Sequence, residues 1–182
     1  MMNMKRSGLA AMLLLGGAGL GWAAGSTGGD EPQPVLSNEQ IQQALAPPQT
    51  RSFTPRGLAR KQAASSDQSV NLNIPFELNS SDLKPQASEQ LKQLELALTS
   101  PALQKDRFVV AGHTDAKGSA QYNKQLSLRR AQTVKKFLIA QGLDGARLDT
   151  VGYGSEKLLA PDHPQDASNR RVEIRDLGPV VH

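Results

Sequence analysis

The chain has 182 residues, of which 38% are hydrophobic and only 4% aromatic, and its formal net charge is +4. These values fit one domain of ordinary size with additional segments, and they argue against an aromatic-lined surface for nucleic acid or carbohydrate. The sequence has no cysteine, which excludes disulfides, thiolate metal ligands and a cysteine nucleophile and leads us to expect no lipid-modified cysteine.

The positive charges are spread along the chain rather than gathered in one region. From Ser69 to the C-terminus, 15 lysines and arginines stand against 13 aspartates and glutamates. A nucleic-acid-binding domain usually carries a concentrated basic face. We therefore expect no nucleic-acid partner.

The N-terminal segment has the three parts of an export signal. A positive start at Lys5 and Arg6 is followed by the apolar, glycine-rich run Leu9–Ala24. Small residues at the end of this run precede polar Ser26. The alternative is an uncleaved membrane anchor, but the run is shorter than the roughly 20 residues of a spanning helix. We expect residues 1–24 to be a signal peptide, and no spanning helix after its removal.

Residues 25–68 have the composition of a flexible linker, rich in proline, glutamine, serine and threonine. One short helix is predicted near residues 38–46, because Ser37 and Gln40 match a capping box and Pro47 would end the helix. Its apolar face would comprise Ile41, Ala44 and Leu45.

A basic stretch of this linker, from Arg51 to Lys61, carries four positive charges and no negative one. Two interpretations remain open at this point. The stretch is either a solvated linker or a segment that is attracted to anionic polymers or lipid headgroups.

A folded domain is expected from residue 69 to residue 176, before a short tail at 177–182. Apolar residues alternate from Val70 to Phe76, as in a strand with one buried face. Four apolar positions then recur at helical spacing, namely Ala87, Leu91, Leu94 and Leu98. The later elements are a strand at 108–111, a long helix at 119–141, and strands at 147–153 and 171–175. This order predicts an α/β (α+β) fold in which helices pack on a mixed sheet of four strands.

The long helix places a charged residue among its apolar positions. At 3.6 residues per turn, Arg130 lies on the same stripe as Leu126 and Val134, whereas Arg129 points to solvent. A guanidinium on an inward face needs a partner, since an unpaired buried charge costs several kcal/mol. The residues alone leave open a structural ion pair, an arginine whose head reaches water, and a ligand site.

Asp115, in the loop before the long helix, is the predicted partner of Arg130. Asn123 lies on the same helix, and the three side chains would form one anion, one amide and one planar cation. A carboxylate can hold an ammonium, and a guanidinium can hold a carboxylate with two hydrogen bonds. The set therefore suits a zwitterionic ligand.

Several motifs, in order, resemble those of the OmpA-like peptidoglycan-binding domain family. They are Phe76–Ser80, Gly112–Gly118, Tyr122–Asn123, Leu126–Ser127, Arg130–Ala131 with Val134, Gly152–Gly154 and Asn169–Ile174. The resemblance covers about Val70 to Ile174. It implies a βαβαβ-type domain with a mixed sheet and a groove for diaminopimelate, the zwitterionic residue of the peptidoglycan peptide stem.

The resemblance also assigns roles to individual residues. It implies that Asp115 and Arg130 hold the zwitterionic end of diaminopimelate. Residues around that end would be Asn79, Asn123 and one arginine of the pair Arg170 and Arg171, of which we assign Arg171. No metal and no cofactor is implied.

Two departures from the family pattern stand out. Glu77 replaces a more usual aspartate, which is a mild change. Gln165 and Asp166 occupy places where the family usually has glycine and arginine. This second departure leaves the shape of the local loop open and adds a negative charge near the rim of the groove.

The predicted function is non-catalytic binding of the diaminopimelate-containing peptide stem, which tethers an envelope protein or complex to the cell wall. We expect the protein in the periplasm of a Gram-negative cell, associated with the wall, with the outer membrane as one candidate place. The alternative is a periplasmic scaffold that docks envelope proteins and binds peptidoglycan weakly or not at all. We do not expect an enzyme, since no nucleophile–base pair or metal-ligand set is recognisable, and we interpret His113 as a residue that orients its loop.

Overall fold

The computed structural model describes residues 34–46 and 68–179. The predicted signal peptide, residues 25–33 and 47–67 of the predicted linker, and with them the basic stretch from Arg51 to Lys61, lie outside the described residues.

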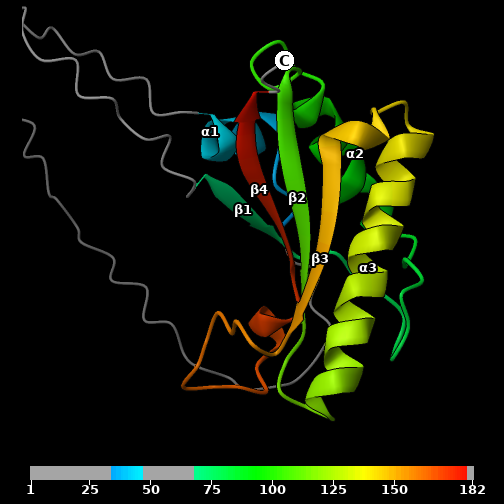
Figure 1. Ribbon diagram of the computed structural model, residues 1–182, viewed down its shortest axis with the longest axis vertical. Coiled ribbons are helices and arrows are strands. Elements are labelled where there is room, and N and C mark those ends of the chain that lie inside the picture. Colours follow the sequence, from blue (N-terminus) through cyan, green and yellow to red (C-terminus); the bar gives the residue numbers. More distant parts are fainter. Residues whose placement is uncertain (1–33, 47–67, 180–182) are drawn as a thin grey trace, which may run out of the picture. The chain divides into compact units, whose positions relative to one another are not determined.

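Four strands form one mixed sheet, in the order β1-β4-β2-β3 (Figure 1). The strands are β1 (Ser69–Leu72), β2 (Asp106–His113), β3 (Leu148–Gly154) and β4 (Val172–Pro179). β2 and β3 are parallel, and β4 is antiparallel to both of its neighbours. The predicted fold class is therefore confirmed. β4 continues to Pro179, beyond the predicted domain end at residue 176, because its ladder with β2 extends to the pair Asp106–Pro179.

Two long helices connect the strands and bury their apolar sides. α2 (Ala87–Leu98) lies between β1 and β2 in the chain, and α3 (Ala120–Ala140) makes the crossover that a parallel pair requires. Figure 1 shows α3 running alongside β3. The predicted apolar face of α2 is confirmed, since all four of its members are fully buried: Ala87, Leu91, Leu94 and Leu98.

α3 packs unusually close to the sheet because glycines face it. A Cβ atom at Gly112 of β2 would overlap the backbone of Ser127, and one at Gly152 of β3 would lie 2.5 Å from the backbone nitrogen of Leu128. Ser127 is fully buried and its hydroxyl accepts a hydrogen bond from the amide of Gly154 at 2.9 Å. The polar residue inside the apolar stripe thus joins helix to sheet.

The short helix α1 (Asn38–Leu45) has the predicted capping box between Ser37 and Gln40. Its surroundings differ from a linker, because Ile41 and Leu45 are fully buried in the same core as α2 and the sheet. Ala44, which we placed on the same face, is exposed. The predicted domain start at residue 69 therefore omits a helix that packs on the domain.

Two glutamines of α2 hold the chain just before α1. The buried Gln90 amide accepts a hydrogen bond from the backbone nitrogen of Leu36 at 2.9 Å and donates one to its carbonyl at 3.3 Å. The side-chain oxygen of Gln93 accepts from the backbone nitrogen of Asn38 at 3.1 Å. α1 is thus fixed by polar contacts at its start as well as by its two buried side chains.

Candidate functional site

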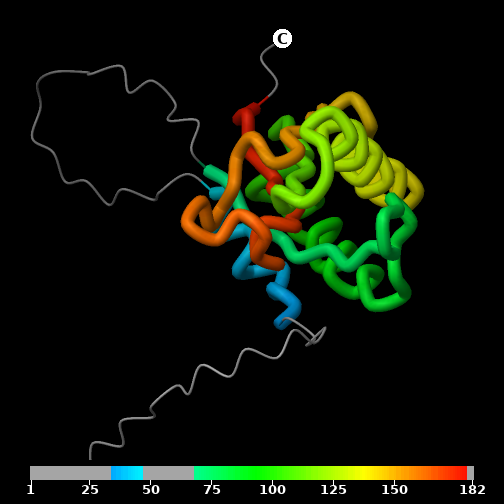
Figure 2. Tube along the Cα trace, turned by 90° about the horizontal axis from the view of Figure 1, so that it is seen from below, coloured from blue at the N-terminus to red at the C-terminus, as the bar shows by residue number. Residues whose placement is uncertain are grey.

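Three segments of the chain meet at one end of the sheet. The loop after β2, the start of α3 and the connection from β3 to β4 lie together at the lower end in Figure 1, and Figure 2 views the domain from that end. The segment 76–83, which we call the 76–83 loop, is closed by a bridge between Phe76 and Leu83 and lies against α3. The predicted site residues are distributed over these segments.

Arg130 projects from α3 toward the 76–83 loop and is half-buried. Its Nε donates a hydrogen bond to the carbonyl of Ser80 at 2.9 Å, and its guanidinium carbon lies 4.9 Å from the centroid of the Phe76 ring. Among the residues that the structure describes, Arg130 forms no ion pair. Burial lowers the pKa of this guanidinium, and the positive charge of Arg170 lowers it further.

Asp115 is paired with Arg170 and not with Arg130, which corrects the predicted ion pair. Its Oδ2 accepts a hydrogen bond from Arg170 at 2.9 Å, and its Oδ1 accepts one from the backbone nitrogen of Lys117 at 3.1 Å. The Asp115 side chain is 10% exposed, whereas that of Arg170 is 46% exposed. Asp115 remains near enough to raise the pKa of Arg130, but less than burial lowers it.

The site thus holds two guanidinium groups and one carboxylate. Arg130 and Arg170 approach closely enough for their charges to interact, and in the described part of the chain Asp115 is the acidic residue that forms an ion pair with one of them. A ligand carboxylate would satisfy the free donors of Arg130, and a ligand ammonium would bind at Asp115. This arrangement suits a group that carries both charges.

Asn123 holds the loop after β2 in place. It is 3% exposed, and its Nδ2 donates to the carbonyl of Lys117 at 2.8 Å and to that of Asp115 at 3.3 Å. The backbone turns at Gly118 with a φ of 87°, a conformation that favours glycine. Asn123 therefore fixes the backbone that presents Asp115, and its amide nitrogen already has partners within the protein.

Asn79 has a left-handed backbone, with a φ of 53°. Its carbonyl accepts a hydrogen bond from the Tyr122 hydroxyl at 3.3 Å, while its side chain is exposed. The carbonyl of the next residue, Ser80, receives Arg130. Two adjacent carbonyls of the 76–83 loop are therefore held by α3, so that the loop and Arg130 fix each other.

Arg171, the arginine assigned to the site from the sequence, donates to groups outside the loop that carries Asp115. Its Nε donates to Oδ1 of Asn71 at 2.8 Å, and its terminal nitrogens donate to the carbonyls of Asn169 and Lys157. Successive residues in extended backbone point to opposite sides. A shift of one residue along the chain therefore determines which of the two arginines can contact Asp115, and in the structure it is Arg170.

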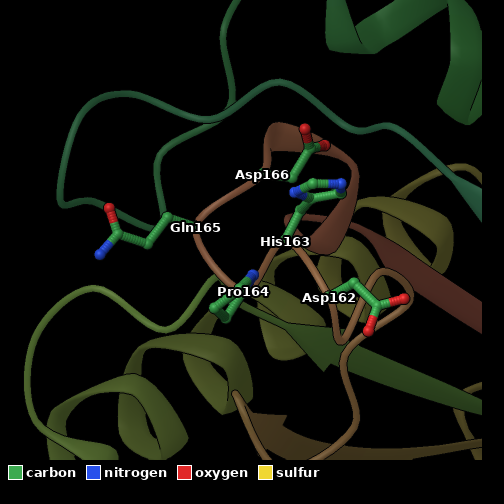
Figure 3. Close-up of a pocket in the computed structure, with 5 residues that line it drawn as sticks. All are labelled: Asp162, His163, Pro164, Gln165 and Asp166. Carbon is green, nitrogen blue, oxygen red and sulfur yellow. The ribbon is translucent and has the colours of Figure 1, made fainter.

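The connection from β3 to β4 contains the departure at Gln165 and Asp166 and lines a shallow pocket (Figure 3). Asp166 caps the short helix Ala167–Asn169, since its Oδ1 accepts from the backbone nitrogen of Ser168 at 2.7 Å. Hydrogen bonds from Ser168 lower the pKa of Asp166, and the nearby charge of Arg170 lowers it further. Figure 3 shows the side chains of His163 and Asp166 next to each other, with Gln165 pointing away.

This connection keeps a defined shape despite the departure. The carbonyl of Pro164 accepts a hydrogen bond from the backbone nitrogen of Ala116 at 2.8 Å, which ties it to the loop that carries Asp115. The buried Asn169 side chain binds three backbone groups, namely the nitrogens of Leu159 and Ala160 and the carbonyl of His163. The sequence did not determine the shape of this loop, and in the structure the loop lies against the segment that carries Asp115.

His113 lies at the end of β2 and is 1% exposed. Its Nε2 lies 3.0 Å from Oε2 of Glu173, and its Nδ1 lies 3.2 Å from the carbonyl oxygen of Lys157. The hydrogen bond with His113 lowers the pKa of Glu173 to about 2, with a further contribution from Arg175. These contacts agree with the orienting role predicted for His113. In residues 34–46 and 68–179 no cluster of His, Asp and Glu suited to a metal ion is found.

Three residues of the site were missed by the sequence reasoning as contacts. Arg170 was the unassigned member of a pair, and Ser80 and Tyr122 appeared only as parts of motifs. Ser80 acts through its backbone carbonyl, which no side-chain pattern reveals.

Within the described ranges, none of the helices is long and apolar enough to cross a membrane.

Comparisons with known proteins agree with this fold. The model of the OmpA family matches residues 75–171. Over 102 residues the chain is 40% identical to a peptidoglycan-associated lipoprotein of Pseudomonas aeruginosa, covering 55% of this chain and 59% of that protein. Over 110 residues it is 36% identical to outer membrane protein A of Bordetella avium, covering 59% of this chain and 56% of that protein. The chain thus spans somewhat more than half the length of these relatives.

A solved structure has the same fold. The OmpA-like domain of FopA1 from Francisella tularensis matches with a TM-score of 0.52 at 24% sequence identity, over 59% of this chain and 71% of that one. At this identity the likeness concerns the fold alone.

Proposed function

Because this chain belongs to the OmpA family, we propose that it binds peptidoglycan without catalysing a reaction, and that the bound group is the diaminopimelate of the peptide stem. The protein then tethers an envelope protein or complex to the cell wall in the periplasm of a Gram-negative cell. One relative is named for its association with peptidoglycan and another as an outer membrane protein, which supports this setting.

A half-buried guanidinium without an acidic partner is the observation that carries the proposal. Arg130 is oriented by one hydrogen bond to Ser80 and by the Phe76 ring, and neither neutralises its charge. A buried cation that lacks an anion is costly, so a ligand carboxylate at this position would gain affinity from the existing charge. Asp115 supplies the opposite charge for the ammonium of the same ligand group.

The roles of the surrounding residues follow from their contacts. Arg130 binds the ligand carboxylate and Asp115 binds the ammonium. Asn123 positions the backbone of Asp115, and the backbone of Asn79 helps to hold the loop against which Arg130 rests. Arg171 supports the connection from β3 to β4 and does not contact the ligand.

Co-sedimentation of the purified protein with isolated sacculi tests the proposal. Asp115→Ala and Arg130→Ala should each weaken binding by about 2–5 kcal/mol, since each leaves one charge of a desolvated pair without its partner. Arg129→Ala is the matched control, because Arg129 is the adjacent arginine of α3 and is exposed. Binding that is unchanged in Asp115→Ala and Arg130→Ala would refute the assignment of the site.

The same preparation addresses the scaffold alternative. If the wild-type protein does not sediment with sacculi, but captures periplasmic proteins equally well with and without Arg130, the scaffold role replaces the proposal. Purified muropeptides incubated with the protein should be recovered intact, since the proposed function involves no bond cleavage.

A further inference from the structure

The ammonium position of the proposed site is already occupied by a cation of the protein itself. Arg170 donates to Oδ2 of Asp115, and the backbone nitrogen of Lys117 donates to Oδ1. Asp115 is 10% exposed at its side chain, so little space remains for a second strong donor beside Arg170. A ligand ammonium must therefore share Asp115 with Arg170 or displace it.

Displacement is feasible because Arg170 is held loosely. Its side chain is 46% exposed, and its one ion pair in the described part of the chain is that with Asp115. An ion pair with an exposed member contributes little to stability. A ligand ammonium would also be repelled by Arg170 if both remained at Oδ2.

A second candidate acceptor for Arg170 lies four residues earlier in the chain. Asp166 is the N-cap and Arg170 the C-cap of the short 3-10 helix Ala167–Asn169, and both residues are exposed. Ser168 donates to the Asp166 carboxylate through its backbone nitrogen, at Oδ1, and through its side chain. A carboxylate offers about four lone-pair sites, so acceptor capacity for a cation remains. The charges of Asp166 and Arg170 already interact, since Arg170 contributes to the lowered pKa of Asp166.

We propose that Arg170 exchanges partners when the ligand binds, moving from Asp115 to Asp166 as the ligand ammonium takes Oδ2 of Asp115. Arg170 is then an internal occupant of the ammonium position, and Asp166 stabilises the bound state without touching the ligand. This inference rests on the proposed function, because it concerns the same site. It assigns a role to the position at which the chain departs from the family pattern.

Two variants separate this exchange from a simple effect of charge. Asp166→Asn removes the charge that would receive Arg170 but keeps the helix cap, because asparagine and aspartate cap equally well. Asp162→Asn is the matched control, since Asp162 is exposed in the same loop and, among the described residues, forms no ion pair with Arg170. Binding of meso-diaminopimelate to the full chain would be measured by calorimetry.

Asp166→Asn should weaken binding about two- to fivefold, the range that corresponds to the value of an exposed ion pair, and Asp162→Asn should not. If Asp166 merely repelled the ligand carboxylate, both variants would bind as well as or better than the wild-type protein, and the proposal would be wrong. Arg170→Gln should tighten binding about two- to fivefold by freeing Asp115. Weaker binding by Arg170→Gln would instead show that Arg170 holds the ligand, which also overturns the exchange.

The double variant provides the decisive comparison. In the Arg170→Gln background, Asp166→Asn should have no larger effect than Asp162→Asn, because the cation that Asp166 receives is absent. An equal loss with and without Arg170 contradicts the exchange. Wild-type protein that fails to bind diaminopimelate at all would overturn the proposed function and this inference together, whereas normal binding with an unaffected Asp166→Asn variant would overturn the inference alone.

Discussion

Replacing Leu45 by alanine tests whether α1 belongs to the cooperative unit of the domain. Leu45 and Ile41 are fully buried in the core cluster. Burial of such a side chain contributes about 1.5–3 kcal/mol, so the two together contribute roughly 3–6 kcal/mol before the cost of ordering the backbone is subtracted. A Leu→Ala change in a core costs about 2–5 kcal/mol, but α1 can also detach, so the loss cannot exceed the free energy of docking.

We therefore expect Leu45→Ala to lower the free energy of unfolding by about 2–3 kcal/mol. Urea unfolding followed by far-ultraviolet circular dichroism would show this as a fall of roughly 1 M in the midpoint. Leu96→Ala is the matched control, since Leu96 belongs to α2 and is 47% exposed, and it should cost less than about 1 kcal/mol. If Leu45→Ala costs no more than Leu96→Ala, α1 docks too weakly to belong to the folded unit, and the extended domain start is wrong.

Two further predictions concern the stability of the sheet. Because His113 lowers the folded-state pKa of Glu173 from its ordinary 4.5 to about 2, the resulting stabilisation is present above pH 4.5 and is lost as the pH falls toward 2. We expect the loss of stability to be about 2 kcal/mol after allowance for solvent screening. Urea unfolding at pH 6 and at pH 3 would measure it, and in Glu173→Gln the difference in stability between the two pH values should be smaller by this amount. A variant with the wild-type pH dependence would contradict the assignment. Gly112→Ala should lower the free energy of unfolding by about 1–3 kcal/mol or more, and the thermal midpoint with it, because the new Cβ overlaps the backbone of Ser127. Ala116→Ser, at an exposed position nearby, should change stability by less than about 0.5 kcal/mol, and equal midpoints for the two variants would refute the close approach of α3.

Hydrophobic periodicity predicted most of the fold because each pattern reports on a single element. The spacing from Ala87 to Leu98 identified the buried face of α2. The alternation after Val70 located β1, but the strand ends at Leu72 and not near Phe76, which pairs with Leu83 instead. Burial of Ile41 and Leu45 was not predictable in the same way. Two apolar residues on one face of a short helix show that it can pack, but they do not show which surface it packs against.

The site was predicted less completely because its contacts depend on orientation over long separations in the chain. The inward position of Arg130 followed from helical geometry, whereas its missing partner did not. Asp115 pairs with a residue 55 positions later, and no local pattern links the two. The choice between Arg170 and Arg171 depends on a single step of strand alternation, which is set by where β4 begins, at Val172.

The topology explains why substitutions at this end of the sheet can change the charges there without disturbing the core. β2 and β3 are parallel and β4 runs against them, so the ends of β2 and β3 and the start of β4 meet at one edge. Asp115 follows β2 and Arg170 precedes β4, and each lies just outside its strand. The strands that carry them are fixed by buried apolar side chains that lie outside the candidate site. A change such as that at Asp166, in the connection between β3 and β4, therefore alters the charge that surrounds Arg170 while the ladder of β2 and β4 keeps Asp115 and Arg170 in register.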